Sequence, residues 1–142
     1  MSNESNQNNI FINGRQQIIE MLQYMEEGEK QKLLNNIKLR NASMAKELSE
    51  QSFSFKNLFS LSRKSLERIF SKVNPAIIGL ALYPLDPKLQ RKALMSLDRG
   101  LAEEAFHIMK QNLSHKKQET QRAQEKIVQI AIQLSKQNHV SL

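Results

Sequence analysis

Helix-start signals that recur at short intervals are the feature that most restricts how this chain can fold. Each signal is an Asn, Asp or Ser that can cap a helix, directly before a stretch with apolar residues at helical spacing. Where a proline follows the cap, it takes the first helical position, which needs no backbone N–H. The signals lie at Ser62, Asn74-Pro75, Asp86-Pro87 and Asp98. They predict a series of short helices over residues 62–109, one of which ends before Pro84.

The rest of the chain shows the same helical period. Apolar spacing predicts a helix that starts at Asn13 and ends near Gly28, and a second helix around residues 33–37. Asn41 is the expected cap of a third helix, and a longer last helix is expected over about residues 114–137. No segment alternates polar residues with β-branched ones. The predicted fold class is therefore all-α, a superhelical arrangement of mostly short helices.

Composition excludes several kinds of site. The 142 residues contain no Cys, three His and four scattered Gly, which rules out thiolate metal sites, cysteine nucleophiles and a glycine-rich phosphate loop. Glu103 and Glu104 are adjacent and point about 100° apart on a helix, so they cannot form a catalytic carboxylate pair. No apolar run is long enough to span a membrane. We therefore expect a cytoplasmic protein without enzymatic activity, cofactor, metal or membrane insertion.

The positive charge belongs to the second part of the chain. Residues 1–50 carry a net charge of −1 and residues 51–142 carry +8, which together give the +7 of the whole chain. Lys88, Arg91 and Lys92 form a predicted basic face, which could bind an acidic protein surface. No aromatic residues alternate with these cations to stack on bases, so nucleic acid is disfavoured as a partner.

Motifs in the middle and at the end of the chain resemble those of a known family. Residues 52–66 read Ser-Phe-Ser-Phe-Lys-Asn-Leu-Phe-Ser-Leu-Ser-Arg-Lys-Ser-Leu, which is similar to the Phe-x-Phe segment of the flagellar motor switch protein FliG. Ala81-Leu82 lies where that family has Ala-Leu-Lys-Gly-Ala, and Ala123-Gln-Glu-Lys-Ile127 matches its Ala-Gln-x-x-Ile. The order and spacing of these motifs extend the resemblance over residues 13–137.

The resemblance implies a division of the chain into parts. Residues 1–12 would be a disordered polar tail, and residues 13–51 would be armadillo-like helices. Residues 52–61 would be the hinge, with Phe53 and Phe55 as its aromatic pair. Residues 62–138 would be a compact helical domain like the family's torque domain. The two upstream domains of the family have no counterpart in this sequence.

The resemblance also implies a function. FliG is a non-enzymatic component of the flagellar switch ring, at the cytoplasmic face of the inner membrane, and its torque helix contacts the stator through charged residues. The corresponding charged ridge here would comprise Arg99, Glu103, Glu104 and Lys116. The family's acidic pair falls near Phe106-His107-Ile108, which carry no carboxylate. A stator contact that depends on charge would therefore lose most of its anionic half.

The armadillo-like helices imply a second surface. In the family such helices stack on those of the next subunit, and short helices without a partner domain leave apolar residues uncovered. The predicted stacking face comprises Ile18, Leu22, Leu33, Leu34 and Ile37. Its expected partners are a second copy of this chain or the armadillo-like helices of a full-length FliG.

Two other functions stay open at this stage. The helical scaffold could serve as a diverged adaptor or regulator outside the motor, with its basic face bound to an acidic protein. Nucleic-acid binding is the least favoured hypothesis, and steeply salt-dependent binding to bulk DNA would support it.

Overall fold

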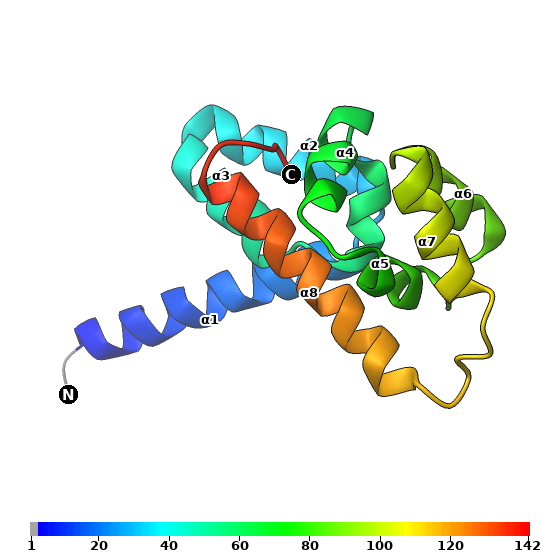
Figure 1. The fold of residues 1–142 in the computed structure, drawn as a ribbon. Helices are drawn as coiled ribbons and strands as arrows, with labels where there is room; N and C mark the ends of the chain where they lie inside the picture. Colours follow the sequence, from blue (N-terminus) through cyan, green and yellow to red (C-terminus); the bar gives the residue numbers. More distant parts are fainter. Residues whose placement is uncertain (1–2) are drawn as a thin grey trace. The chain divides into compact units, whose positions relative to one another are not determined.

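The computed structural model describes the backbone of residues 3–142 and the side chains of residues 14–142. Those residues form helices and no strands, which confirms the all-α prediction (Figure 1). The elements in chain order are α1 (Asn3–Tyr24), α2 (Glu27–Arg40), α3 (Ala42–Gln51), the 3-10 helix η1 (Phe55–Ser60), α4 (Arg63–Ser71), α5 (Pro75–Leu82), α6 (Pro87–Met95), α7 (Arg99–Met109) and α8 (Lys117–Lys136). They fall into two units, Met1–Phe53 and Ser54–Leu142.

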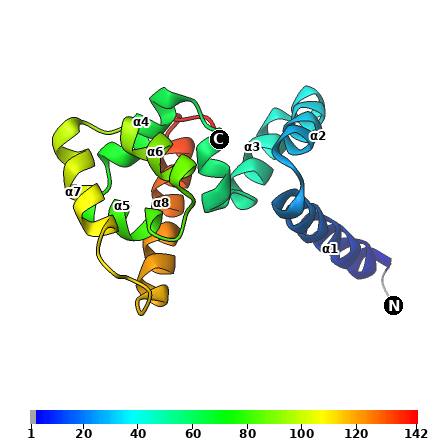
Figure 2. The same cartoon turned by 90° about the vertical axis from the view of Figure 1, so that its right-hand side faces the viewer.

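The first unit contains α1, α2 and α3 around a small apolar core (Figure 2). Ile19 and Leu22 of α1 meet Leu34 of α2 and Leu48 of α3 in this core. A salt bridge of 2.6 Å between Arg15 and Glu47 joins α1 to α3 at the surface. Each helix thus contributes an apolar stripe to the core, as expected of amphipathic helices too short to be stable alone.

The boundaries of the first two helices differ from the sequence-based expectation. The backbone of α1 already begins at Asn3, whereas the sequence predicts a disordered tail and a start at Asn13. Once a helix is nucleated, each further residue adds one backbone hydrogen bond, so the polar residues can extend it upstream. The side chains of residues 1–13 lie outside the described part. Gly28 lies in the first turn of α2 and does not end α1.

Most of the predicted helix caps are confirmed. The side chains of Asn41, Ser62, Asn74 and Asp86 accept hydrogen bonds from backbone N–H groups at 3.1, 3.2, 2.9 and 3.0 Å. Asp98 occupies the N-cap position of α7 without such a bond. These caps satisfy N–H groups that lack a partner in the first helical turn, which explains why the helix starts can be read from sequence.

The start of the last helix was not predictable in this way. Helix α8 begins at Lys117, not near Ser114. The side-chain oxygen of Asn112 accepts hydrogen bonds from the N–H and the hydroxyl of Ser114, at 3.2 and 2.8 Å. These bonds hold Ser114 in a turn before the helix, a local alternative that Asn and Ser side chains commonly offer.

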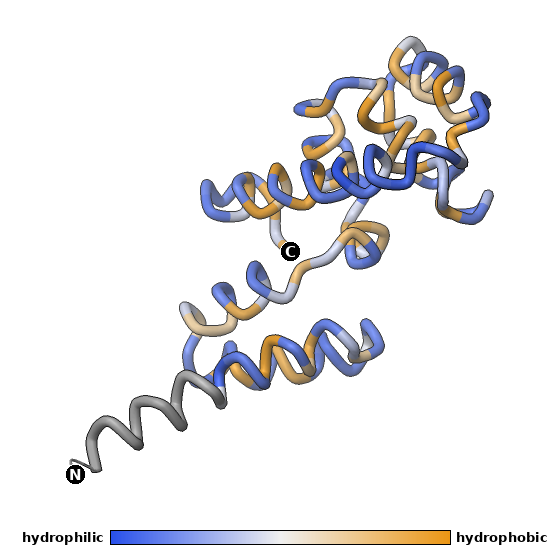
Figure 3. Tube along the Cα trace, turned by 90° about the horizontal axis from the view of Figure 1, so that it is seen from below, coloured by the Kyte–Doolittle hydropathy of each residue, from blue (hydrophilic) through white to orange (hydrophobic). Residues whose placement is uncertain are grey.

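The core of the second unit is built on α5, the most apolar of its helices. Ile78, Ala81 and Leu82 of α5 are fully buried, and α5 packs against both α7 and α8 (Figure 1). Figure 3 shows hydrophilic residues over the first turns of α8 and hydrophobic ones toward its C-terminal end. The buried side chains of α8 accordingly include Ile127, Ala131 and Leu134. Helix α5 is therefore the element on which the other helices of this unit are arranged.

A glycine allows the closest helix contact in the second unit. A Cβ atom on Gly79 of α5 would lie 2.7 Å from the carbonyl oxygen of Ala105 and 2.7 Å from Cβ of Ile108, both on α7. Ala105 is itself fully buried at this crossing. Only a residue without a side chain lets the two backbones approach this closely.

The C-terminal residues continue the fold beyond residue 138, the predicted end of the helical domain. Asn138 adopts a positive φ of 61°, and the N–H of His139 bonds to the carbonyl of Leu134 at 2.9 Å. This is the arrangement of a Schellman motif, in which a left-handed residue closes the helix end. Arg68 of α4 donates to the carbonyl of His139 at 2.5 Å, and Val140 is buried. The chain end is thereby held on the second unit.

We predict that Gly79→Ala lowers the free energy of unfolding by about 1–3 kcal/mol, because the added methyl group overpacks the contact between α5 and α7. Urea denaturation of the purified protein measures this change.

Gly100→Ala is the matched control, because a Cβ atom at Gly100 meets nothing within 4 Å. This variant should be more stable by about 0.5 kcal/mol, since alanine favours helix over glycine. Equal effects of the two substitutions would contradict the close crossing at Gly79.

Candidate functional site

The predicted hinge contains the division between the two units. Phe53 is the last residue of the first unit and Ser54 the first of the second. Both aromatic residues of the predicted pair are buried, and the Phe55 ring packs edge-on against Phe59, with centroids 5.6 Å apart. Residues 55–60 form the helix η1 and belong to the second unit. The stretch that could bend between the units is therefore shorter than the predicted 52–61, and its movement stays a prediction.

A local hydrogen-bond motif fixes the conformation of Ser54, the first residue of the second unit. The Oδ1 atom of Asn57 accepts from the N–H of Ser54 at 2.9 Å and from the hydroxyl of Ser54 at 2.8 Å. Asn57 is buried, so these bonds are shielded from water. They fix the entry of the chain into η1 immediately after Phe53.

The predicted charged ridge is only partly assembled. Arg99 and Glu103 of α7 form an ion pair of 3.2 Å, with side chains 94% and 69% exposed. Glu104 is also exposed on α7, but about 100° around the helix from Glu103. Lys116 is exposed at the residue before α8. The structure therefore brings Arg99 and Glu103 together, while Glu104 and Lys116 lie apart from this pair.

Phe106 and Lys110 extend the ion pair along α7 and were not predicted as site residues. Phe106 is 46% exposed, and the Nζ atom of Lys110 lies 5.3 Å from the centre of its ring. With Arg99 and Glu103 they follow steps of four, three and four residues, which places all four on one side of the helix. That spacing was visible in the sequence, but the exposure of the aromatic ring was not.

The predicted basic face is also divided by the structure. Lys88 and Arg91 are exposed on α6. The Nζ atom of Lys92 instead donates a hydrogen bond to the backbone carbonyl of Phe59 in η1. Lys92 is therefore part of the packing of α6, because a carbonyl at the end of a short helix needs a donor.

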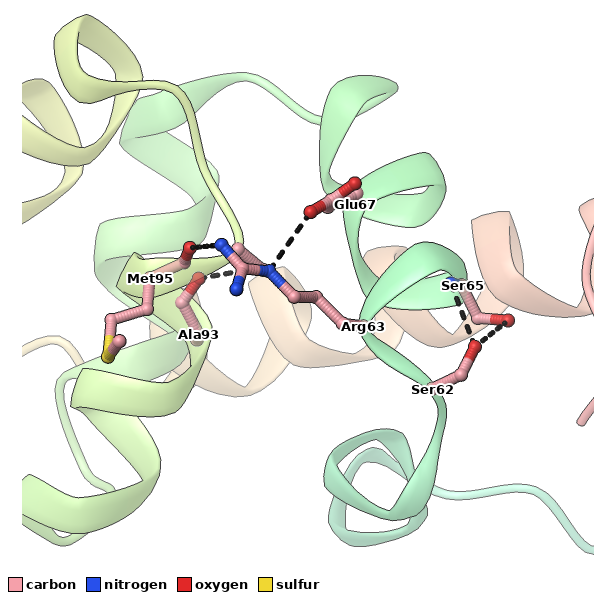
Figure 4. A network of polar contacts seen from close by, with 7 residues as sticks. Ser62, Arg63, Ser65, Glu67, Ala93 and Met95 are labelled. Atoms are coloured by element: carbon pink, nitrogen blue, oxygen red, sulfur yellow. Dashed lines mark hydrogen bonds and ion pairs between the residues drawn. The ribbon is translucent and has the colours of Figure 1, made fainter.

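Polar contacts hold α6, which buries only one side chain, Ala93. Besides the contact of Lys92, the Nε2 atom of Gln90 donates to the carbonyl of Leu82 at the end of α5, at 3.0 Å. Arg63 of α4 donates to the carbonyl of Met95 at 3.3 Å and pairs with Glu67 at 3.2 Å (Figure 4). These side-chain donors add to the packing of α6, in which Leu89 and Leu94 are also partly buried.

The predicted stacking face lies largely in the core of the first unit. Leu22 and Leu34 are buried there, and Ile18, Leu33 and Ile37 are partly buried against the same cluster. Among residues 14–53, the large apolar side chains that are exposed are instead Met21, Tyr24 and Leu39, of which the last two are 87% and 86% exposed. Stacking through the five predicted residues stays a prediction, and these three side chains offer the accessible apolar surface.

The described residues contain neither a cluster of metal-ligating side chains nor a buried polar side-chain atom without a hydrogen-bond partner. Within residues 14–142, no three His, Asp or Glu side chains are grouped as metal ligands require. Every buried polar side-chain atom in that range has a hydrogen-bond partner. No helix in the described part of the chain is both long and apolar enough to cross a membrane.

Residues 35–142 match the family model of the FliG C-terminal domain. The chain belongs to this family. The match spans the end of α2 from residue 35, all of α3, and η1 with every other helix of the second unit. It confirms the resemblance seen in the sequence. It also supports a flagellar motor switch component and does not favour the adaptor outside the motor.

Solved FliG structures share the fold of this FliG-family chain. The structure of FliG residues 116–343 from H. pylori is 19% identical, with a TM-score of 0.60, and the match covers 87% of this chain and 55% of that one. Full-length FliG from Aquifex aeolicus is 20% identical, with a TM-score of 0.55 and coverage of 85% and 38%. The chain thus spans between about two-fifths and three-fifths of the length of these FliG chains. No curated protein sequence matches it.

We predict that Lys92→Met in this FliG-family chain lowers the free energy of unfolding by about 1 kcal/mol, because the carbonyl of Phe59 loses its charged donor. Lys88→Met removes the same charge from the same helix and should change stability by less than about 0.5 kcal/mol. Thermal or urea unfolding compares the two variants. If Lys88 proved as important as Lys92, the assignment of Lys92 to packing would be wrong.

Proposed function

We propose that this protein is a non-enzymatic component of the flagellar switch ring, at the cytoplasmic face of the inner membrane. The match to the FliG C-terminal domain over residues 35–142 is the observation that carries the proposal. The protein acts by contacts with other proteins. Its second unit faces the stator, and its first unit joins the ring subunits.

The stator-facing role rests on the surface of α7. Arg99 and Glu103 are strongly exposed and satisfy each other as an ion pair, which contributes little to folding stability. Charges that a fold does not need are available for recognition, where they set the rate and specificity of association. Rotation at the boundary between Phe53 and Ser54 would then move this surface relative to the ring, because the units divide there.

The ring-joining role rests on the first unit. Its three helices bury one small core and leave Tyr24 and Leu39 almost fully exposed. Large apolar side chains that are this exposed are available to contact a partner protein. The proposed partners are the armadillo-like helices of a full-length FliG or a second copy of this chain.

Co-purification tests the place of the protein in the motor. The tagged protein is isolated from its native cell, and bound proteins are identified by mass spectrometry. We expect switch and stator proteins with the wild type, and loss of the stator protein alone with Arg99→Glu, since the reversed charge repels Glu103 and its partner surface. Arg122→Glu is the control, because Arg122 is exposed on a different helix, α8. Recovery of no flagellar protein would refute the proposal.

Sedimentation tests the ring-joining surface separately. We expect the wild type to associate at high concentration and the double variant Tyr24→Ser, Leu39→Ser to remain a monomer. Met95→Ser is the matched control, because Met95 is 63% exposed but belongs to the second unit. Analytical ultracentrifugation of the three proteins measures this. A wild type that stays monomeric in the presence of full-length FliG would exclude the proposed stacking.

A further inference from the structure

We propose that the row Arg99, Glu103, Phe106 and Lys110 on α7 binds an acidic amphipathic helix of its partner, with Phe106 as the apolar anchor. The inference rests on the proposed function for its setting, and it specifies the chemistry of the partner. It differs from a purely ionic contact, because the central residue is aromatic.

The four residues form one continuous surface. Arg99 and Glu103 are paired at 3.2 Å, and Lys110 lies over the Phe106 ring at 5.3 Å from its centre. Lys110 is the C-cap residue of α7 and keeps helical dihedral angles, so the row stays straight to its end. At 1.5 Å per residue it extends over about 16 Å. A row of side chains at steps of three and four is the ridge that a second helix packs against.

Phe106 supplies the anchor of this surface. Its ring is about half exposed, although the neighbouring Ala105 is fully buried. The ammonium of Lys110 already restrains the ring through a cation–π contact, which lowers the entropy lost on binding. Aromatic residues, including Phe, are enriched at protein interfaces relative to the rest of the surface.

Charge selects an acidic partner over a basic one. The row carries two cations and one carboxylate, and that carboxylate is already paired with Arg99. Lys110 stands at the C-terminal end of the row, where no carboxylate of α7 balances it. The surrounding residues 51–142 carry a net charge of +8. A basic segment would be repelled, whereas acidic side chains on either side of an apolar residue complement Arg99, Phe106 and Lys110.

Stapled helical peptides test the inference without any motor protein. One peptide presents Leu flanked by Glu on the same face, a second presents Leu flanked by Lys, and a third presents Glu with Gln in place of Leu. We expect only the Leu/Glu peptide to shift the amide NMR signals of residues 99–110. Its affinity should fall about tenfold in Phe106→Ala, because truncating an anchor residue typically has an effect of that size.

Two further variants make the test specific. Glu104→Gln removes an exposed charge from the other side of α7 and should leave the affinity unchanged. Lys110→Glu should weaken the Leu/Glu peptide and allow the Leu/Lys peptide to bind. The inference is overturned if the Leu/Lys peptide binds the wild type equally well, if no peptide binds, or if the shifted signals lie outside α7.

The outcomes separate this inference from the proposed function. Peptide binding at α7 together with no recovery of flagellar proteins from cells would overturn the motor assignment and leave the partner chemistry in place. Recovery of the stator protein by both the wild type and Phe106→Ala would overturn the anchor role and leave the motor assignment in place.

Discussion

The contact between α5 and α7 at Gly79 is the constraint on which the second unit depends. A Cβ atom there would come within 2.7 Å of the α7 backbone, so the two helices approach as closely as their main chains allow. Helix α5 also packs against α8, and its inner residues are fully buried. Because close-packed interiors do not absorb an extra methyl group easily, this crossing fixes where α7 lies. The exposed side of α7, which carries the proposed binding row, is the opposite side of the same helix.

The two faces of α7 therefore have separate physical roles. Ala105 and Ile108 face Gly79, and changes there act on folding. Arg99, Glu103 and Lys110 are exposed, and substitution of such residues changes stability little. This separation makes the surface free to diverge while the fold is retained. It is consistent with a chain about one-fifth identical to FliG that still has a similar fold.

Helix α6 illustrates a different way of holding a short helix. Only Ala93 is fully buried, and Leu89 and Leu94 are partly buried, so polar contacts supplement its packing. Gln90, Lys92 and Arg63 supply donors to backbone carbonyls of α5, η1 and α6. Two of these three side chains lie on the helix itself, which leaves Lys88 and Arg91 as its free cations. The basic face predicted from composition is thus smaller than a count of charges suggests.

Local chemistry determined the features that the sequence predicted correctly. Asn41, Ser62, Asn74 and Asp86 cap helices through bonds to N–H groups two or three residues ahead, so the helix starts could be predicted without tertiary information. The period of the apolar residues likewise indicated an all-α chain, and the ordered motifs indicated the family.

Tertiary structure alone decided which surface residues remain available. The sequence cannot show that Lys92 bonds to the carbonyl of Phe59, that Leu22 and Leu34 are buried in the core of their own unit, or that Phe106 stays half exposed. Each of these three outcomes depends on contacts between residues that are distant in sequence, which no local sequence pattern can indicate. Helix caps and the spacing of apolar residues are properties of a single helix. A binding surface consists of the side chains that stay exposed after the helices have packed.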